Sequence, residues 1–345
     1  LETADFQIYL LPITYCLVMV FGLLGNLGAL YFFFFKMEQK SPSSAFVVSL
    51  AVADTIFLCA LPFRIHYHLN GNDWRFGDVM CRITGTVFFG NIYISIAFMT
   101  CICLDRYIAT IHPHTYLQLR NTRWALMVTV AVWVVTGTAT LTFMMTCPLA
   151  TDGSDGDQQD AISCFENFSH EAWRSSLMPY SAISLVFGAL LPSLVILVCY
   201  PLVARRITRI KTATAKSALR IIYAILAITV LCFLPYHVVH LLHLLWRTNV
   251  INNCTAADVI YKIRRVTMAL VSLNSLLDPV LYYFATGRCK WSFRWNLDWL
   301  KLKKTKTVYT VSDHYRTKWK VLLLSVIVCQ KGQQVGVRKR DPAEF

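Results

Sequence analysis

Seven long apolar segments constrain the fold of this chain more than any other feature of its sequence. Each is long enough, at roughly 20 residues or more, to cross the hydrocarbon core of a bilayer as an α-helix. The runs are continuous and show no period of two, which disfavours a transmembrane β-barrel. Only 15% of the 345 residues are charged, as is typical of a membrane protein. The predicted spans are approximately 8–36, 45–69, 79–108, 124–146, 178–204, 219–246 and 259–284.

The basic residues between these spans predict the orientation of the chain. Lys and Arg gather in the segments 36–44, 108–123 and 205–220, whereas the segment 148–172 contains neither. The positive-inside rule therefore predicts an extracellular N-terminus and a cytoplasmic C-terminus in the plasma membrane. Most of the net charge of +14 then faces the anionic inner leaflet, so we expect membrane lipids and no nucleic acid as partners.

The C-terminal part has a different pattern. Residues 291–304 mix Trp, Phe and Leu with Arg and Lys, which predicts a short amphipathic helix lying in the membrane interface. We therefore expect one helical domain over 1–304 and a disordered tail over 305–345. Cys289, at the membrane edge beside basic residues, is a candidate for palmitoylation, with an inert cysteine as the alternative.

Each predicted span also carries one conspicuous residue or motif. In chain order these are Asn26, Asp54, Asp105-Arg106-Tyr107, Trp133, Pro192, Pro235 and Asp278-Pro279-Val280-Leu281-Tyr282. Over roughly 8–304 this register resembles that of the rhodopsin-like (class A) G-protein-coupled receptors. The resemblance implies an all-α fold, a seven-transmembrane helix bundle with a short amphipathic eighth helix. A transporter or a channel would have to produce the same register by chance.

Three further motifs look like one branch of that family. They are Asn91-Ile92-Tyr93-Ile94-Ser95, Cys164-Phe165-Glu166-Asn167-Phe168 and Cys232-Phe233-Leu234-Pro235-Tyr236-His237-Val238. The branch holds the proton-sensing, platelet-activating-factor, lysophosphatidic-acid, cysteinyl-leukotriene and nucleotide receptors. Its members share these motifs, so the motifs do not select one ligand.

The resemblance also implies an activation switch. Asp105 would pair with Arg106 at rest, and on activation the arginine would swing free while the bundle opens for a helix of a heterotrimeric G protein. Arrestin is the second cytoplasmic partner that the family implies. Phe233 stands where many members have Trp. The remaining switch positions carried over are Tyr107, Tyr200, Pro235, Asp278, Pro279 and Tyr282.

Other family features map onto single residues of this chain. Asp54, Ser95, Asn274 and Asp278 match the positions that hold a sodium ion, and a hard cation does prefer several oxygen ligands. The alternative is a dry hydrogen-bond network around a protonated aspartate. No other cofactor is expected. Cys81 and Cys164 match the disulfide between the third helix and the second outer loop. The sequons at Asn167 and Asn253 predict glycosylation of outer loops.

Basic residues in the outer half of the spans indicate the kind of ligand. Arg64 and His66 lie on the second span, His237 and His240 lie three residues apart on the sixth, and the seventh carries basic residues at its start. Converging cations in an apolar cavity suit an anionic head group. The residues predicted to bind ligand are Arg64, His66, Tyr93, His237, His240, Arg264 and Arg265. We therefore predict a small anionic ligand, lipid-derived rather than a nucleotide.

Three alternatives to this ligand prediction remain. A cluster of outer histidines near acidic residues would titrate near neutral pH, as a proton-sensing receptor requires. A nucleotide receptor is disfavoured because His240 stands where nucleotide receptors of this branch carry Arg or Lys. A decoy receptor that binds ligand without signalling is disfavoured by the intact Asp105-Arg106-Tyr107. The chain has no P-loop, metal-binding Cys/His spacing or nucleophile elbow, so we expect no enzymatic activity.

Overall fold

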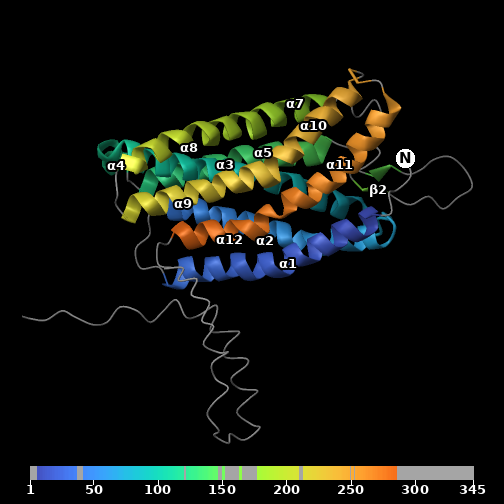
Figure 1. Cartoon of the computed structure of the whole chain (residues 1–345). Coiled ribbons are helices and arrows are strands. Elements are labelled where there is room, and N and C mark those ends of the chain that lie inside the picture. Colours follow the sequence, from blue (N-terminus) through green and yellow to red (C-terminus); the bar gives the residue numbers. More distant parts are fainter. Residues whose placement is uncertain are drawn as a thin grey trace, which may run out of the picture. The chain divides into compact units, whose positions relative to one another are not determined.

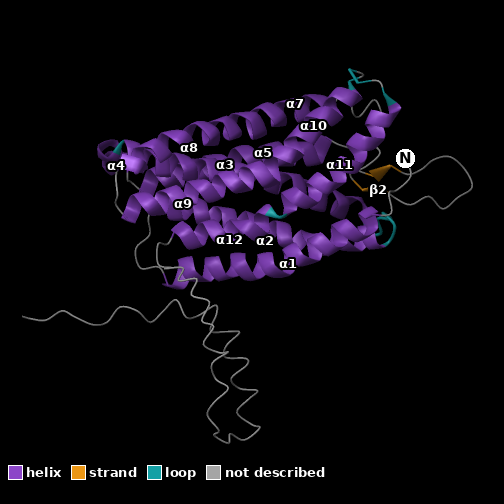
Figure 2. Ribbon diagram, in the orientation of Figure 1, coloured by secondary structure: helices purple, strands orange, loops and turns teal. Residues whose placement is uncertain are grey.

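The computed structural model of the protein is a bundle of long helices lying side by side (Figures 1 and 2). The eighth helix predicted over 291–304, the tail over 305–345, Asn167 and Cys289 all lie outside the described residues. The described residues are 6–36, 42–119, 122–146, 150–151, 163–164, 177–209, 213–248, 250–251 and 253–285.

The first four predicted spans are continuous helices. The first, α1 (Phe6–Tyr31), ends in a π-helical turn, η1 (Phe32–Lys36), and the second is α2 (Pro42–Leu69). The third is α3 (Gly77–Ile111), which the short α4 (Pro113–Leu119) follows. The fourth is α5 (Thr122–Thr146), whose apolar side chains are mostly exposed, as expected of a helix that faces lipid.

The fifth and sixth spans each contain a π-helical turn directly before a proline. In the fifth span, the N–H of Leu191 donates to the carbonyl of Val186, five residues back, and Pro192 follows. In the sixth, the N–H of Leu234 donates to Thr229 in the same way, before Pro235. Proline has no N–H and its ring crowds the carbonyl four residues earlier, so the wider turn relieves the crowding. The segments are α7 (Met178–Leu185), η3 (Val186–Leu190) and α8 (Leu191–Arg209), then α9 (Ala213–Ile228), η4 (Thr229–Phe233) and α10 (Leu234–Arg247).

The seventh member of the bundle is divided in two. It consists of α11 (Cys254–Ser272) and α12 (Asn274–Ala285), with a turn at Leu273. Asn253 begins α11 as its cap, because its side-chain oxygen accepts a hydrogen bond from the N–H of Thr255 at 2.9 Å. Within the described part of the chain, six stretches of helix are long and apolar enough to cross a membrane. With α11 and α12 they make the predicted seven-helix bundle, so that prediction is confirmed.

A small β-hairpin was not predicted. The strands β1 (Ala150–Thr151) and β2 (Ser163–Cys164) pair antiparallel, with Ala150 opposite Cys164. The larger hydrophobic core runs along the inside of the bundle and includes Leu50, Phe98 and Phe233, all fully buried. A second, smaller core lies at the end of the bundle that carries β2. We call this the disulfide end, and the opposite end, where α3 carries Arg106, the Arg106 end.

Candidate functional site

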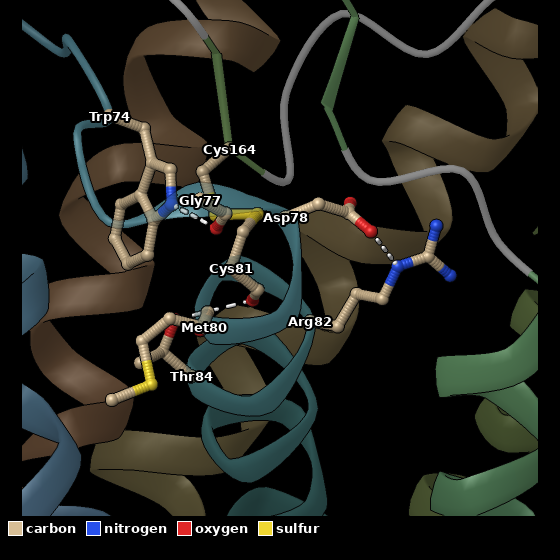
Figure 3. Close-up of a disulfide and its surroundings, with 8 residues drawn as sticks. All are labelled: Trp74, Gly77, Asp78, Met80, Cys81, Arg82, Thr84 and Cys164. Atoms are coloured by element: carbon tan, nitrogen blue, oxygen red, sulfur yellow. Dashed lines mark hydrogen bonds and ion pairs between the residues drawn. A yellow bond between two sulfur atoms is a disulfide. The ribbon is translucent and has the colours of Figure 1, made fainter.

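A disulfide organises the disulfide end of the bundle (Figure 3). Cys81, in the first turns of α3, is bonded to Cys164 of β2, with the two Cα atoms 5.8 Å apart, so the predicted pairing is confirmed. Trp74 is 2% exposed and its indole N–H donates to the carbonyl of Gly77 at 2.8 Å. Cys81 and Trp74 belong to the smaller core together with Tyr67, Phe143, Cys164 and Leu177. The disulfide therefore holds β2 against the end of α3.

The carboxylates described at the disulfide end all have a basic neighbour. Asp78 pairs with Arg82 at 2.6 Å (Figure 3). Arg82 also donates to the carbonyl of Met144, which ties α3 to the last turn of α5. The two remaining carboxylates described there form the pairs Asp73–Arg75 and Asp258–Lys262. These pairs involve exposed or half-buried side chains, so they lie at the surface of the bundle.

A cavity opens between the helices below the disulfide. Its wall is mostly aromatic, and its polar groups are hydroxyls, one imidazole and one guanidinium. Three of the residues predicted to bind ligand, Tyr93, His240 and Arg264, meet here from α3, α10 and α11. The complete lining is Phe89, Tyr93, Phe143, Leu177, Tyr180, Ser181, Ser184, Tyr236, His240 and Arg264.

The histidines of α10 lie beside this cavity. His240 stacks on Tyr236, with ring centroids 5.9 Å apart, and His243 lies 3.3 Å from a guanidinium nitrogen of Arg264. His237 is 6% exposed and packs between Phe233 and Tyr93. Neither ring nitrogen of His237 has a hydrogen-bond partner among the described residues. An unsatisfied buried imidazole is costly, so this position suits a polar group of a ligand or a water.

The other predicted ligand residues lie away from the cavity. Arg64 is 5% exposed and its guanidinium lies 5.6 Å from the centroid of the Phe88 ring. Arg265 is equally buried and donates to the hydroxyl of Tyr261 at 2.8 Å. His66 is exposed at the end of α2, where it contacts Asn70 and Phe76. The predicted residues are thus divided between the cavity wall, two buried arginines and the surface.

A buried polar cluster occupies the middle of the bundle. The carboxylate of Asp54 is fully buried and accepts from the hydroxyl of Ser275 at 2.7 Å. It also accepts longer hydrogen bonds, both 3.4 Å, from the amide of Asn91 and the hydroxyl of Tyr282. Sequence reasoning missed Asn91 and Ser275. Their positions in the sequence could have indicated them, because Ser275 follows Asn274 directly and Asn91 lies one helical turn before Ser95.

Asn26 joins this cluster because Pro279 leaves a nearby backbone carbonyl without its helical hydrogen bond. Pro279 has no N–H, so the carbonyl of Ser275, four residues earlier, loses its helical donor. The side-chain amide of Asn26 donates to that carbonyl at 2.9 Å, and its oxygen accepts from Tyr282 at 3.1 Å. The Pro279 ring reaches this position because Gly25 has no side chain, and a Cβ there would lie 2.6 Å from the ring.

The same cluster retains unsatisfied oxygens. Both carboxylate oxygens of Asp278 and the hydroxyl of Ser95 are buried without a hydrogen-bond partner among the described residues. Asp278 is close enough to Asp54 for their charges to interact directly. Two adjacent buried carboxylates and spare hydroxyl and amide oxygens are a donor set that fits a hard cation. Asp54, Asn274 and Asp278 are linked by these contacts, and Ser95 lies one helical turn after Asn91 on α3.

At the Arg106 end two of the predicted switch residues, Asp105 and Arg106, form an ion pair. The Nε of Arg106 is 3.4 Å from a carboxylate oxygen of Asp105, and these side chains are 20% and 10% exposed. The first segment of the sixth span, α9, packs against α3, α8 and α12. Tyr200 of α8 meets Tyr223 of α9, with ring centroids 5.0 Å apart. Tyr107 lies by His112, with ring centroids 6.0 Å apart, whereas the Tyr282 hydroxyl reaches into the central cluster.

Comparison with known proteins identifies the family. The family model described as "7 transmembrane receptor (rhodopsin family)" matches residues 25–282. The lysophosphatidic acid receptor 6 of Gallus gallus is 33% identical over 289 residues, which cover 82% of this chain and 92% of the relative. The lysophosphatidic acid receptor 4 of Mus musculus is 31% identical, covering 86% and 80%, and a purinoceptor of Gallus gallus is 34% identical, covering 83% and 78%.

These relatives are signalling receptors of the predicted branch, not enzymes, which agrees with both predictions. The motifs on its spans, the Cys81–Cys164 disulfide and the match over 25–282 all point to the same conclusion. The chain is a multi-pass protein of the cell membrane whose partners are a G protein and a small-molecule or lipid ligand. It belongs to the rhodopsin family of seven-transmembrane, G-protein-coupled receptors.

Proposed function

We propose that this receptor binds a small, anionic, lipid-derived ligand in the cavity between α3, α5, α7, α10 and α11, and in response activates a heterotrimeric G protein. The observation that carries the proposal is the single guanidinium of Arg264, with His240, in a wall that is otherwise largely aromatic. One cation suits one anionic head group, and aromatic rings suit an acyl chain. Two of the relatives compared are named as lysophosphatidic acid receptors, which supports the same ligand class.

The relative named as a purinoceptor makes a nucleotide the second candidate. A nucleotide di- or triphosphate carries several charges, and recognition of such groups uses several cations. The cavity lining contains one arginine and no lysine. Arg64 and Arg265 are buried elsewhere in the bundle, beside Phe88 and Tyr261. The charge at the cavity therefore favours the lipid over the nucleotide.

Replacing Arg264 by alanine is expected to raise the concentration of 1-oleoyl-lysophosphatidate needed for half-maximal G-protein activation by about thirtyfold, because a charge-assisted hydrogen bond contributes roughly 2 kcal/mol. His240→Ala is expected to have a smaller effect in the same direction. Lys262→Ala, which removes a half-exposed cation of the same helix, is the control and should leave the response unchanged. An unchanged response of Arg264→Ala would reject the site.

The same cells also test the alternative ligands. A response to ATP or ADP without one to lysophosphatidate would favour the nucleotide. A response to lowering the external pH from about 8 to about 6 without added lipid would favour proton sensing through the outer histidines. Ligand binding without any G-protein activation would make the protein a decoy receptor.

We further propose that the disulfide end is extracellular, with the N-terminus outside and the C-terminus in the cytoplasm. Disulfides form in oxidising compartments, which supports this orientation. Arg106 and Asp105 would then face the cytoplasm, where the proposal places G-protein and arrestin binding. Glycosylation of Asn167 and Asn253 and palmitoylation of Cys289 remain proposals that fit the same orientation.

The central cluster is proposed to hold a sodium ion between Asp54, Ser95, Asn274 and Asp278. The purified receptor should then melt at a higher temperature in sodium chloride than in choline chloride of equal ionic strength. A sodium concentration ten times the dissociation constant adds about 1.4 kcal/mol to the free energy of unfolding. Asp54→Asn should abolish the difference, and Asp258→Asn, at the surface, should preserve it. If wild-type receptor melts alike in both salts, the cluster is a dry hydrogen-bond network.

A further inference from the structure

Gly188 belongs to none of the sequence motifs and does not line the cavity, yet it supports the Tyr93 ring in the cavity wall. Gly188 lies in the middle of the π-helical turn η3, which contacts α3. A Cβ built on Gly188 would lie 2.4 Å from Cδ1 and 2.8 Å from Cε1 of Tyr93, and 3.4 Å from Cγ. The first two distances are well below van der Waals contact, so the Tyr93 ring lies directly on the glycine backbone.

The Tyr93 ring has little freedom to move elsewhere. It lines the cavity, and its centroid is 6.2 Å from that of His237 on α10. Its hydroxyl interacts with the side chain of Ser184, which lies one turn before Gly188 and also lines the cavity. The two clashing atoms, Cδ1 and Cε1, lie off the χ2 axis, so a side chain at 188 requires the ring to rotate about χ2 or to shift. Either movement changes the position of the Tyr93 ring in the cavity wall.

We propose that Gly188 is a positioning residue for the ligand site: by seating the Tyr93 ring it sets the width of the cavity between α3 and α10, and hence the bulk of ligand that enters. This inference rests on the proposed function only in taking that cavity as the ligand site. The π-helical turn before Pro192 brings the bare backbone to this position, and such turns recur at functional sites.

The first test measures how readily a small reagent enters the cavity in the absence of ligand. Ser181→Cys places a thiol in the cavity lining, and its reaction with a positively charged methanethiosulfonate reagent measures how open the cavity is. Adding Gly188→Ala is expected to slow the reaction about tenfold, the scale that overpacking by one methyl produces. Further replacement of Tyr93 by leucine, which removes the clashing ring, is expected to restore it. Gly137→Ala, where a Cβ meets nothing within 4 Å, is the matched control.

The second readout is the response to 1-oleoyl-lysophosphatidate, which should weaken about tenfold when Gly188→Ala is added to the wild type and stay unchanged when it is added to Tyr93→Leu. If Gly188→Ala does not reach the cell surface, recovery of surface expression by Tyr93→Leu supports the inference, and failure to recover overturns it. An unchanged labelling rate in a well-expressed Gly188→Ala also overturns it. Slowed labelling in a receptor whose wild type ignores lysophosphatidate rejects the proposed ligand and supports the role of Gly188.

Discussion

Replacing Cys81 or Cys164 by alanine is expected to remove most of the folded receptor from the cell surface. The disulfide closes a segment of 83 residues, for which the chain-entropy account gives at most about 4.5 kcal/mol. The true loss is smaller in a bilayer, where the separated helices are already ordered. The second contribution is local, because the two cysteines are the centre of the smaller core that contains Trp74 and Leu177. Both contributions act on the same end of the bundle.

The double variant distinguishes this explanation from a general sensitivity to cysteine replacement. Because the two cysteines act through one bond, Cys81→Ala, Cys164→Ala and the double variant should lose similar amounts of surface receptor. Cys59→Ala, at an exposed free cysteine of α2, should retain the wild-type level. Surface antibody binding measures the level, and ligand response per surface receptor measures whether the cavity survives. Additive losses in the double variant would contradict the prediction.

The helices could be predicted from the sequence because one physical requirement dominates each of them. A backbone that crosses hydrocarbon must satisfy its hydrogen bonds internally, so each continuous apolar run of sufficient length forms a helix. The predicted limits of 45–69 and 124–146 agree with α2 and α5 within a few residues. The divided seventh span and the π-helical turns were not predicted. A proline leaves the carbonyl four residues earlier without its helical donor, and the new partner can lie on another helix, as Asn26 does for the carbonyl of Ser275.

The site was less predictable than the fold because the direction in which each side chain points from its helix determines whether it lines the cavity. Arg264 and Arg265 are adjacent in sequence, yet Arg264 lines the cavity and Arg265 contacts Tyr261 of its own helix. Neighbouring residues on a helix point about 100° apart, so the two arginines cannot both face the cavity. Gly188 gave no signal because its role depends on Tyr93, 95 positions away in the chain. Composition can indicate an anionic ligand, but the packing of helices selects the residues.

Replacing Arg106 by alanine is expected to abolish G-protein activation by ligand while leaving ligand binding intact. The proposed switch requires the guanidinium to leave Asp105 and enter the space that opens when α9 moves away from α3. Without the guanidinium the opened form has no such group for the G protein to engage, so the coupling energy between ligand and G protein is lost. Radiolabelled lysophosphatidate binding and G-protein activation in the same membranes separate the two effects. Arg75→Ala, a 70% exposed arginine, should behave as wild type.

Replacing Asp105 by asparagine is expected to raise G-protein activation in the absence of ligand. This variant removes the negative partner of Arg106 and keeps the size of the side chain. The ion pair is partly exposed, so its contribution is modest, about 1 kcal/mol. That energy corresponds to an increase of about fivefold in the population of the open form, and hence in activity without ligand, as long as the open form is rare. The Arg106→Ala, Asp105→Asn double variant should be silent, because the released group is then absent. Basal activity that persists in the double variant would show that Asp105 restrains the bundle through a group other than Arg106.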